Sequence, residues 1–474
     1  MDAKKVLEIA SLLISKKNLN DLINEILFSI RELVNADAGS IYLYDDEKDE
    51  LTFKYTQNDS LDISFNEFTI PVDENSIAGY CALNKEAFTI DDVYKIPDNY
   101  PFKFNNDFDV LSGYRTKSML LIPIFDAKNN LISVLQLINK KVVSFGEKVR
   151  DFENEVISFS SEDLELVKSL SGIIGVSLEN SILYENIENM FEGFIKASVQ
   201  AVESRDPITK GHTERVYRIT HKIIEEMDKD EEFFPDFKMR DIDWKILKYA
   251  TLLHDFGKIG VREAVLMKPK KLYDDQFEKL KMKARLYACV NNLTKEEYQD
   301  LLNDLIRANE PSLLESELSE KIDKYYKVKF KDCYGEELEL LDDNEYKQLS
   351  VKKGTLTNEE RKEIESHVLH TYEYLNKIPW TKELKEVPKI ACLHHEKLDG
   401  SGYPFGLKSE EIHIFGKVMA VADIFDALTA KDRPYKRAVP IDIALKIIKE
   451  EADKEKLDKK IVEFFITKKI YNMV

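Results

Sequence analysis

The apolar positions in the first third of the chain follow two kinds of pattern. Between Leu7 and Val34 they recur every three or four residues, which predicts amphipathic helices. Short β-prone stretches separated by turn-forming residues follow at 40–45, 50–56, 86–91, 118–126 and 131–139. Only residues 127–130 separate the last two stretches, which predicts a hairpin. We therefore expect an α+β domain over 1–160 with a mostly antiparallel sheet flanked by helices.

Residues 161–200 have the pattern of one long linker helix, without proline and with one interruption at Ser171. The apolar residues near heptad a and d positions are Leu164, Val167, Ile174, Leu178 and Ile182. Two interpretations are open. The helix either packs on its own domain or forms a coiled coil that makes the protein a homodimer.

From residue 198 onward, one segment after another has helical spacing of its apolar residues, which predicts an all-α domain over 201–474. Within it, about 280–353 is rich in Lys, Glu, Asp and Tyr and contains no histidine. We interpret this stretch as a mostly helical insertion that forms an accessory element.

Composition and charge narrow the functional classes. The chain has 474 residues, of which 43% are apolar and 33% charged, as in a soluble multidomain protein. An excess of acids gives a net charge of −19, which argues against general DNA or RNA binding. A small phosphorylated ligand remains compatible with this charge, since a few local cations can hold one.

Cysteine usage and hydropathy predict a cytoplasmic protein that does not enter a membrane. The cysteines Cys81, Cys289, Cys333 and Cys392 lie far apart and form no CxxC pair, so we expect reduced thiols. The apolar stretch near the N-terminus is short, contains Glu8 and lacks a cleavage site. Later apolar runs such as 119–125 are far shorter than the ~18 residues of a membrane span.

Histidines are confined to the second half of the chain. All eight follow residue 211: His212, His221, His254, His367, His370, His394, His395 and His413. The pair His254-Asp255 offers an imidazole beside a carboxylate, which suits a divalent cation that activates water. An aspartate that hydrogen-bonds a buried histidine is a common arrangement, and for this pair alone it is the more frequent explanation. Lys258 places a cation close to it.

Two further stretches carry candidate ligands. Asp423 lies among apolar residues, where a carboxylate is costly unless it is paired or binds a metal. Its neighbour Asp426 is expected to cap or hydrogen-bond within its own helix. His394 and His395 would point about 100° apart on a helix, so they can share a metal only near a helix end or between helices. A glycine-rich turn closed by Pro404 follows them.

Five blocks in this order resemble the HD-GYP phosphodiesterases, a branch of the metal-dependent HD phosphohydrolases. The resemblance covers about 198–466 apart from the insertion, and its blocks are 204–216, 254–258, 365–375, 394–404 and 421–435. It implies hydrolysis of cyclic di-GMP to linear pGpG and, by a second cut, to GMP.

The resemblance also implies the residues of the active site. Two divalent metals, iron or manganese, would be held by His212, His254, Asp255, His367, His394, His395 and Asp423, with Asp255 shared. Asp255 and Lys258 would be catalytic, and the substrate would contact Lys258, Tyr403, Arg433 and Lys436. Ile208 replaces an acid that holds a third metal in some relatives, so we expect two metals.

Some positions fall outside this pattern. Relatives have Pro-x-x-Gly after the fourth histidine, and this chain has Val-Leu-His-Thr at 368–371, which predicts a different local helix geometry. His221, His370 and His413 are expected to be surface or structural histidines.

Residues 18–180 resemble a GAF domain, a small-molecule sensor module, most clearly at 76–94 and 113–124. Part of the pattern of cyclic-nucleotide-binding GAF domains is present at Asn139, Lys140, Phe159 and Asp163, but Leu164 replaces its glutamate. The ligand is therefore undetermined, with a cyclic nucleotide as one candidate. Haem or metal sensing is not expected, because the domain has no histidine and only Cys81.

Two alternatives to a GAF-regulated cyclic di-GMP phosphodiesterase remain. One is an HD-type hydrolase of another nucleotide, such as ppGpp or a dNTP, against which the complete segment 394–404 argues. The other is a signalling adaptor that binds the dinucleotide or a protein without cleavage, which the complete set of ligands disfavours.

Overall fold

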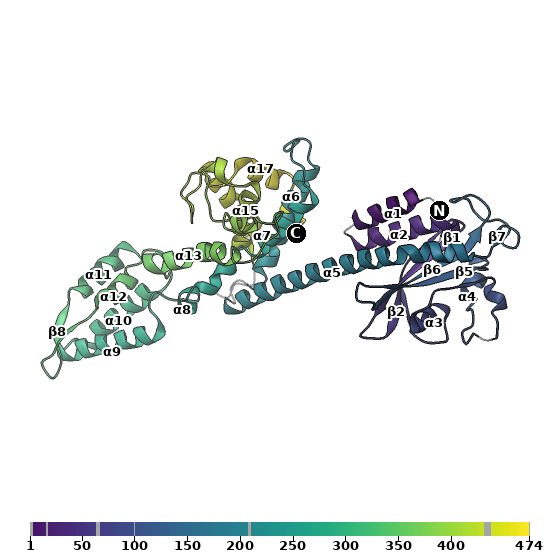
Figure 1. Cartoon of the computed structure of the whole chain (residues 1–474). Coiled ribbons are helices and arrows are strands. Elements are labelled where there is room, and N and C mark those ends of the chain that lie inside the picture. The colour runs from purple at the N-terminus through teal and green to yellow at the C-terminus, as the bar shows by residue number, and fades with distance from the viewer. Residues whose placement is uncertain are drawn as a thin grey trace. The chain divides into compact units, whose positions relative to one another are not determined.

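The computed structural model (Figure 1) describes residues 3–15, 18–62, 67–98, 100–206, 210–430 and 438–473. The chain forms two compact units, Met1–Glu192 and Gly193–Val474. The expected fold class, an α+β domain, a long helix and a helical domain, is confirmed.

Unit 1 is built on one antiparallel sheet. Its strands are β1 (Ala36–Asp45), β2 (Glu50–Asn58), β3 (Phe68–Pro71), β4 (Phe88–Ile90), β5 (Met119–Phe125), β6 (Leu131–Lys141) and β7 (Val156–Ile157). The order is β3-β2-β1-β6-β5-β4, and β7 also pairs with β6. The expected hairpin joins β5 and β6, and the Asp126 carboxylate fixes its turn by accepting from the amides of Lys128 and Asn130.

Helices cover both faces of this sheet (Figure 1). On one face lie α1 (Ala3–Ser15), α2 (Leu19–Val34) and α5 (Ser161–Arg205), and on the other lie α3 (Ile77–Asn84) and α4 (Asp107–Ser112). Each face has its own apolar core, the first around Ile26 and Leu137 and the second around Cys81 and Leu121.

Helix α5 carries two different apolar stripes. Val167, Ile174 and Leu178, which the heptad pattern singled out, are buried in the core of unit 1, so at these residues the helix packs on its own domain. The stripe that remains exposed consists of Val176, Leu183, Ile187 and Met190. By length and composition alone, α5 is also a candidate membrane span, but the burial of one stripe in the core makes this weak evidence.

Unit 2 is helical around a central site. Its main helices are α6 (His212–Lys229), α7 (Asp241–Leu252), α8 (Glu263–Leu266), α13 (Asn358–Leu375), α14 (Val387–Ala391), α15 (Ile414–Thr429), α16 (Ile441–Asp453) and α17 (Lys459–Thr467). Helix α6 packs against α7 and α15, and α14 packs against α7, α13 and α15. Residues such as Ile223, Leu247 and Val418 fill the space between them.

The inserted segment has a small core of its own. It contains α9 (Asp274–Val290), α10 (Lys295–Asn309), α11 (Ser316–Tyr326), β8 (Lys329–Lys331), β9 (Glu337–Glu339) and α12 (Asp343–Leu349). Leu272 already belongs to its core with Leu305 and Leu340, so the segment begins before residue 280. The short hairpin of β8 and β9 was not predicted. All four cysteines of the chain are free thiols.

Candidate metal centre

Five separate segments of unit 2 bring the candidate ligands together. His212 is the first residue of α6, His254 and Asp255 follow the end of α7, and His367 lies within α13. The two remaining segments are the turn after α14, with His394 and His395, and α15, with Asp423. Ligands that stand far apart in the sequence thus reach one place through helix packing.

A glycine allows the closest of these approaches. Gly257 lies in a short 3-10 helix (Phe256–Gly260) that packs on α13, and a Cβ atom there would lie 1.9 Å from the carbonyl oxygen of His367. The Thr371 hydroxyl accepts a hydrogen bond from the Gly257 amide (2.8 Å) and donates one to the His254 carbonyl (3.0 Å). Helix α13 continues without a break through residues 368–371. Thr371 of this helix therefore attaches the segment with His254 and Gly257 to α13.

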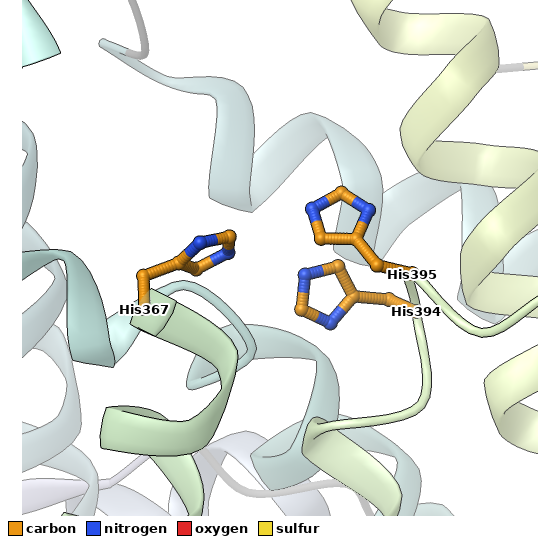
Figure 2. A group of neighbouring side chains, drawn as sticks. All are labelled: His367, His394 and His395. Atoms are coloured by element: carbon orange, nitrogen blue, oxygen red, sulfur yellow. The ribbon is translucent and has the colours of Figure 1, made fainter. Parts of the chain in front are cut away.

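The ligand atoms form overlapping groups in which all atoms lie within 4.8 Å of one another. These groups are His212 with His254 and Asp423, His254 with Asp255 and His394, and His367 with His394 and His395. Figure 2 shows His367 projecting from α13 toward the other two imidazoles of the last group. Asp255 links the groups, since its two oxygens lie 3.5 Å from His254 Nε2 and 3.3 Å from His367 Nε2.

Backbone carbonyls orient three of the imidazoles. The Nδ1 atoms of His254, His367 and His394 each lie 2.6–2.8 Å from the carbonyl oxygen three residues earlier, so Nδ1 carries the proton. The opposite Nε2 atoms are buried and make no hydrogen bond to any residue that the structure describes. Buried polar atoms without partners are costly, and this arrangement is the one that metal-binding histidines adopt.

The protonation states also suit a metal. Burial lowers the pKa of His254 and His394, and it lowers the pKa of His395 to about 3, so these rings are neutral ligands at pH 7. Burial would raise the pKa of Asp255 and Asp423, but Lys258 lowers it for Asp255 and His212 lowers it for Asp423, so both remain carboxylates. Burial would lower the pKa of His212, but Asp423 and Asp426 in turn raise it to about 9, so this ring must lose a proton when it binds a metal. Neutral imidazoles beside carboxylates fit a divalent transition metal.

Asp426 has a role that the sequence did not reveal. We expected a cap or a contact within its helix, but its Oδ2 lies 2.7 Å from His212 Nδ1, on a different helix. The Nε atom of Arg215 donates to the other oxygen at 2.6 Å. Asp426 therefore orients His212 toward Asp423, which lies 3.1 Å from its Nε2 atom. The signal in the sequence was the spacing of three residues, which puts both aspartates on one helix face.

Glu396 was also missed, and it shapes the turn beside the histidines. It is buried, and its two oxygens accept from the amides of Phe405 (2.8 Å) and Leu407 (2.9 Å). This holds the glycine-rich turn against His395, whose ring centre is 4.8 Å from that of Tyr403. Burial raises the pKa of Tyr403, so its hydroxyl stays protonated.

The other expected residues lie in varied places. The ammonium group of Lys258 lies 2.7 Å from Asp255 Oδ2. Arg433 and Lys436, and the position of Ile208, lie outside the described residues. The three histidines left out of the site make other contacts: the ring of His221 lies against that of Trp244 at a tilt, His370 stacks on Tyr374, and His413 caps α15.

Unit 1 contains a cavity of about 610 Å³ on the sheet face that α3 covers. The six aromatic residues of its lining are Tyr42, Phe53, Phe68, Phe104, Phe108 and Tyr114, and its charged residues are Asp73, Asp107, Asp109 and Lys103. The partial cyclic-nucleotide pattern lies elsewhere. Lys140 pairs with Asp163, and the Asn139 side chain accepts from the backbone amide of Lys117, so these residues stabilise the fold.

Comparison with known proteins identifies both units. The GAF domain model matches residues 18–178, and an HD domain model matches 344–461. The chain is 27% identical over 259 residues to the 3′3′-cGAMP-specific phosphodiesterase 3 of Vibrio cholerae, covering 55% of this chain and 35% of the relative. It is 28% identical over 264 residues to the cyclic di-GMP phosphodiesterase of Thermotoga maritima, covering 56% of this chain and 45% of the relative.

The chain thus spans less than half the length of these two relatives. The HD match includes α13 and α15 with their candidate ligands, and the GAF match includes the whole sheet. Both domain types expected from the sequence are thus confirmed, with the match to a GAF domain preceding the match to an HD domain along the chain.

Proposed function

We propose that the protein is a metal-dependent phosphodiesterase that hydrolyses cyclic di-GMP to linear pGpG and, by a second cut, to GMP. The observation that carries this proposal is the convergence of the seven ligands, with buried Nε2 atoms that make no hydrogen bond to a described residue. Relatives named as cyclic-dinucleotide phosphodiesterases support the substrate class.

The family resemblance assigns the seven ligands to two divalent cations, iron or manganese, and the overlapping ligand groups are compatible with this assignment. His212, His254, Asp255 and Asp423 would hold one, and His367, His394 and His395 would hold the other, with Asp255 shared. When bound, such cations neutralise phosphate charge and make water acidic enough to act as a nucleophile near neutral pH.

The chain's own residues position the substrate and keep the ligands ready. Lys258 offsets the charge of Asp255 and, at 2.7 Å from it, is placed to contact the phosphate that reacts. Tyr403 forms a wall of the pocket beside His395. Arg433 and Lys436 are proposed to bind phosphate or guanine edges, a role that suits guanidinium and ammonium groups.

A turnover assay with metal analysis on the same sample tests the proposal. The purified chain is incubated with cyclic di-GMP, and the products are separated by chromatography. We expect pGpG from the wild type and none from His394→Ala or Asp255→Ala, which should also lose metal while the GAF domain stays folded. His221→Ala is the matched control, because His221 contacts Trp244 outside the ligand groups. Wild-type rates in either ligand variant would refute the assignment.

The same assay separates the alternatives. Cyclic GMP-AMP belongs in the panel as a second candidate substrate, because one relative is named for it. Turnover of ppGpp or a dNTP alone would identify another HD-type nucleotide hydrolase. Tight binding of the dinucleotide without cleavage, in a sample with full metal content, would identify a signalling adaptor.

We further propose that the GAF cavity binds a small regulatory molecule. Its aromatic lining suits a planar ring, and three carboxylates against one lysine favour a neutral or cationic ligand over an anionic cyclic nucleotide. Calorimetric titration of the whole chain with guanosine and with cyclic GMP compares the two classes. Tighter binding of cyclic GMP would contradict the charge argument.

The exposed stripe of α5 supports a homodimer. Val176, Leu183, Ile187 and Met190 follow one another at intervals of seven, four and three residues, and Asn180 occupies the a position between the first two. A single asparagine at such a position is typical of two-stranded coiled coils. Free thiols and a cyclic dinucleotide substrate would suit a cytoplasmic location.

Sedimentation of the purified chain tests the dimer. We expect a dimer for the wild type and a monomer for Leu183→Glu/Ile187→Glu. Glu185→Gln, which changes a charge on the same helix outside the stripe, should leave the dimer intact. A monomeric wild type at micromolar concentration would contradict the proposal.

A further inference from the structure

A positively charged cleft of unit 2 lies where the inserted segment meets the beginning of α13. It measures about 410 Å³, and its lining residues are Lys347, Ser350, Val351, Lys352, Lys353, Leu356, Thr357, Asn358 and Arg361. Four of these are cations, and none of the described lining residues is a carboxylate. Such a local excess of positive charge stands out in a chain whose net charge is −19.

Two acids beside this cleft are already paired, one with a lysine of the lining and one with a buried lysine outside it. Glu359 pairs with Lys347 at 2.6 Å. Both oxygens of Glu360 lie within 2.9 Å of the Lys268 ammonium, which is buried away from solvent. The other three cations of the lining, Lys352, Lys353 and Arg361, form no ion pair with any residue that the structure describes.

Backbone contacts fix the position of these lysines. The amide of Leu314 donates to the Lys352 carbonyl at 2.9 Å, and the amide of Gly354 donates to the Pro311 carbonyl at 3.2 Å. The turn that carries the two lysines is thus attached to the chain segment between α10 and α11. Cations held by a fixed backbone lose less conformational entropy on binding an anion than cations on a free tail.

The beginning of α13 adds to the positive potential. Thr357 is the N-cap of this 18-residue helix, and it lines the cleft together with Asn358. The first amides of a helix have no partner within the helix and carry a partial positive charge. The hydroxyl of Ser350, also in the lining, makes no hydrogen bond to a described residue.

We propose that this cleft is a binding site for a phosphate-bearing anion, separate from the metal centre. The ammonium groups of Lys352 and Lys353 and the guanidinium of Arg361, which form no ion pair with a described residue, match the charge and the acceptor oxygens of a phosphate group. Arg361 precedes His367 by six residues, about 9 Å along the helix axis, so the site is distinct from the ligand groups. The charge of Arg361 nevertheless acts on the pKa of Tyr403 in the glycine-rich turn.

Two sources could supply this chemistry, namely free phosphate and the terminal phosphate of a nucleotide such as a linear dinucleotide. The site goes beyond the proposed hydrolysis and does not depend on it. Binding is therefore measured in the full-length His394→Ala variant, where phosphate binding at the metal centre is weakened. Calorimetric titrations use inorganic phosphate and, separately, linear pGpG.

The decisive variant is Lys352→Glu/Lys353→Glu. We expect it to weaken phosphate binding by about tenfold or more, because two charge-assisted contacts become repulsive. Lys352→Arg/Lys353→Arg should retain binding. Lys279→Glu/Lys331→Glu, which makes the same charge change at exposed lysines of the inserted segment, is the matched control and should also bind as before.

The outcomes are separable. Tighter binding of pGpG than of phosphate, lost in the double Glu variant, identifies a nucleotide as the natural source, and equal affinities identify free phosphate. The proposal is overturned if neither probe binds, or if the control variant loses affinity as much as the test variant. If the wild type does not hydrolyse cyclic di-GMP but phosphate or pGpG still binds in the cleft, the proposed hydrolysis fails and the proposed anion site stands.

Discussion

The metal centre of unit 2 and the cavity of unit 1 differ in how their polar atoms are held. At the metal centre, backbone carbonyls fix three imidazoles, and a carboxylate from another helix fixes a fourth. The cavity of unit 1 is lined by aromatic, aliphatic and polar residues, and part of its polar lining serves the fold: Asp109, for example, accepts from Thr116 and Tyr94. Buried imidazole nitrogens that are oriented but unbonded indicate metal binding, whereas the shape and lining of the cavity indicate only the size and charge of a ligand.

Removal of metal should give the largest separation between the two units. We expect chelation to abolish turnover and to lower the unfolding temperature of unit 2 while the transition of unit 1 stays unchanged. At a free metal concentration of about 100 times Kd, bound metal contributes about 2.7 kcal/mol to the unit that binds it. Calorimetry and turnover before and after readdition of metal measure both effects. An equal shift in both transitions would break the comparison.

The next largest effect is expected from Gly257→Ala. The added methyl group would lie 1.9 Å from the His367 carbonyl oxygen, so α13 and the segment with His254 must separate. We expect a loss of about 1–3 kcal/mol in the free energy of unfolding of unit 2, measured with urea, together with reduced metal content.

Gly172→Ala on α5 is the matched control, because a Cβ atom there meets nothing within 4 Å. It should stabilise unit 1 by about 0.5–1 kcal/mol through helix propensity. Equal stability of the wild type and Gly257→Ala would show that the close approach does not position the ligands.

Asp426→Ala tests whether orientation of a ligand matters as much as its presence. Without the carboxylate, His212 loses the contact that fixes its ring, and metal affinity should fall by about 10–100-fold. Competition with a chelator of known affinity measures this change. Asp426→Asn keeps an acceptor oxygen for His212 and should show a smaller loss, whereas equal losses would point to charge alone.

The smallest effect concerns a buried charge that serves no site. The Lys271 side chain is fully buried, its ammonium contacts the Leu349 carbonyl at 3.3 Å, and burial lowers its pKa to about 8. Below pH 8 the lysine is protonated in the folded and the unfolded chain, and folding bears the cost of desolvating it. Between about pH 8 and 10.5 the unfolded chain binds more protons, so the contribution of Lys271 to stability rises with pH.

Lys271→Met should therefore stabilise the chain by about 1–2 kcal/mol at pH 7 and reduce this rise. Urea unfolding of the variant and the wild type from pH 7 to 10.5 gives the difference, and exposed Lys279→Met is the control. A variant less stable than the wild type at pH 7 would mean that the amine makes a favourable buried contact.

The sequence predicted much of the fold because local signals and global structure agree. The alternation of apolar and polar residues gave the strands of the sheet, and the blocks around His254, His394 and Asp423 identified the candidate ligands without any knowledge of distance. Contacts between segments that lie far apart in the sequence could not be predicted from these patterns. Asp426 lies 214 residues from His212, and no local pattern connects the two.

Helix α5 shows a second limit of sequence patterns. Its apolar residues form two stripes, and spacing alone could not tell the buried stripe with Ile174 from the exposed one with Leu183. The inserted segment shows a third limit, since the three-residue strands β8 and β9 are too short for an alternating pattern to reveal.

The attachment of the inserted segment depends on a lysine that precedes it. Lys268, just before the segment, bonds both to Gln348 at its far end and to Glu360 in the first turn of α13. The buried ammonium group of Lys268 thus connects the beginning of the inserted segment, its end and helix α13. Helix α13 carries both Glu360 and His367, so a tilt of the inserted segment would move this helix and shift the imidazole of His367. A molecule that binds the inserted segment could therefore act on the metal centre without entering it.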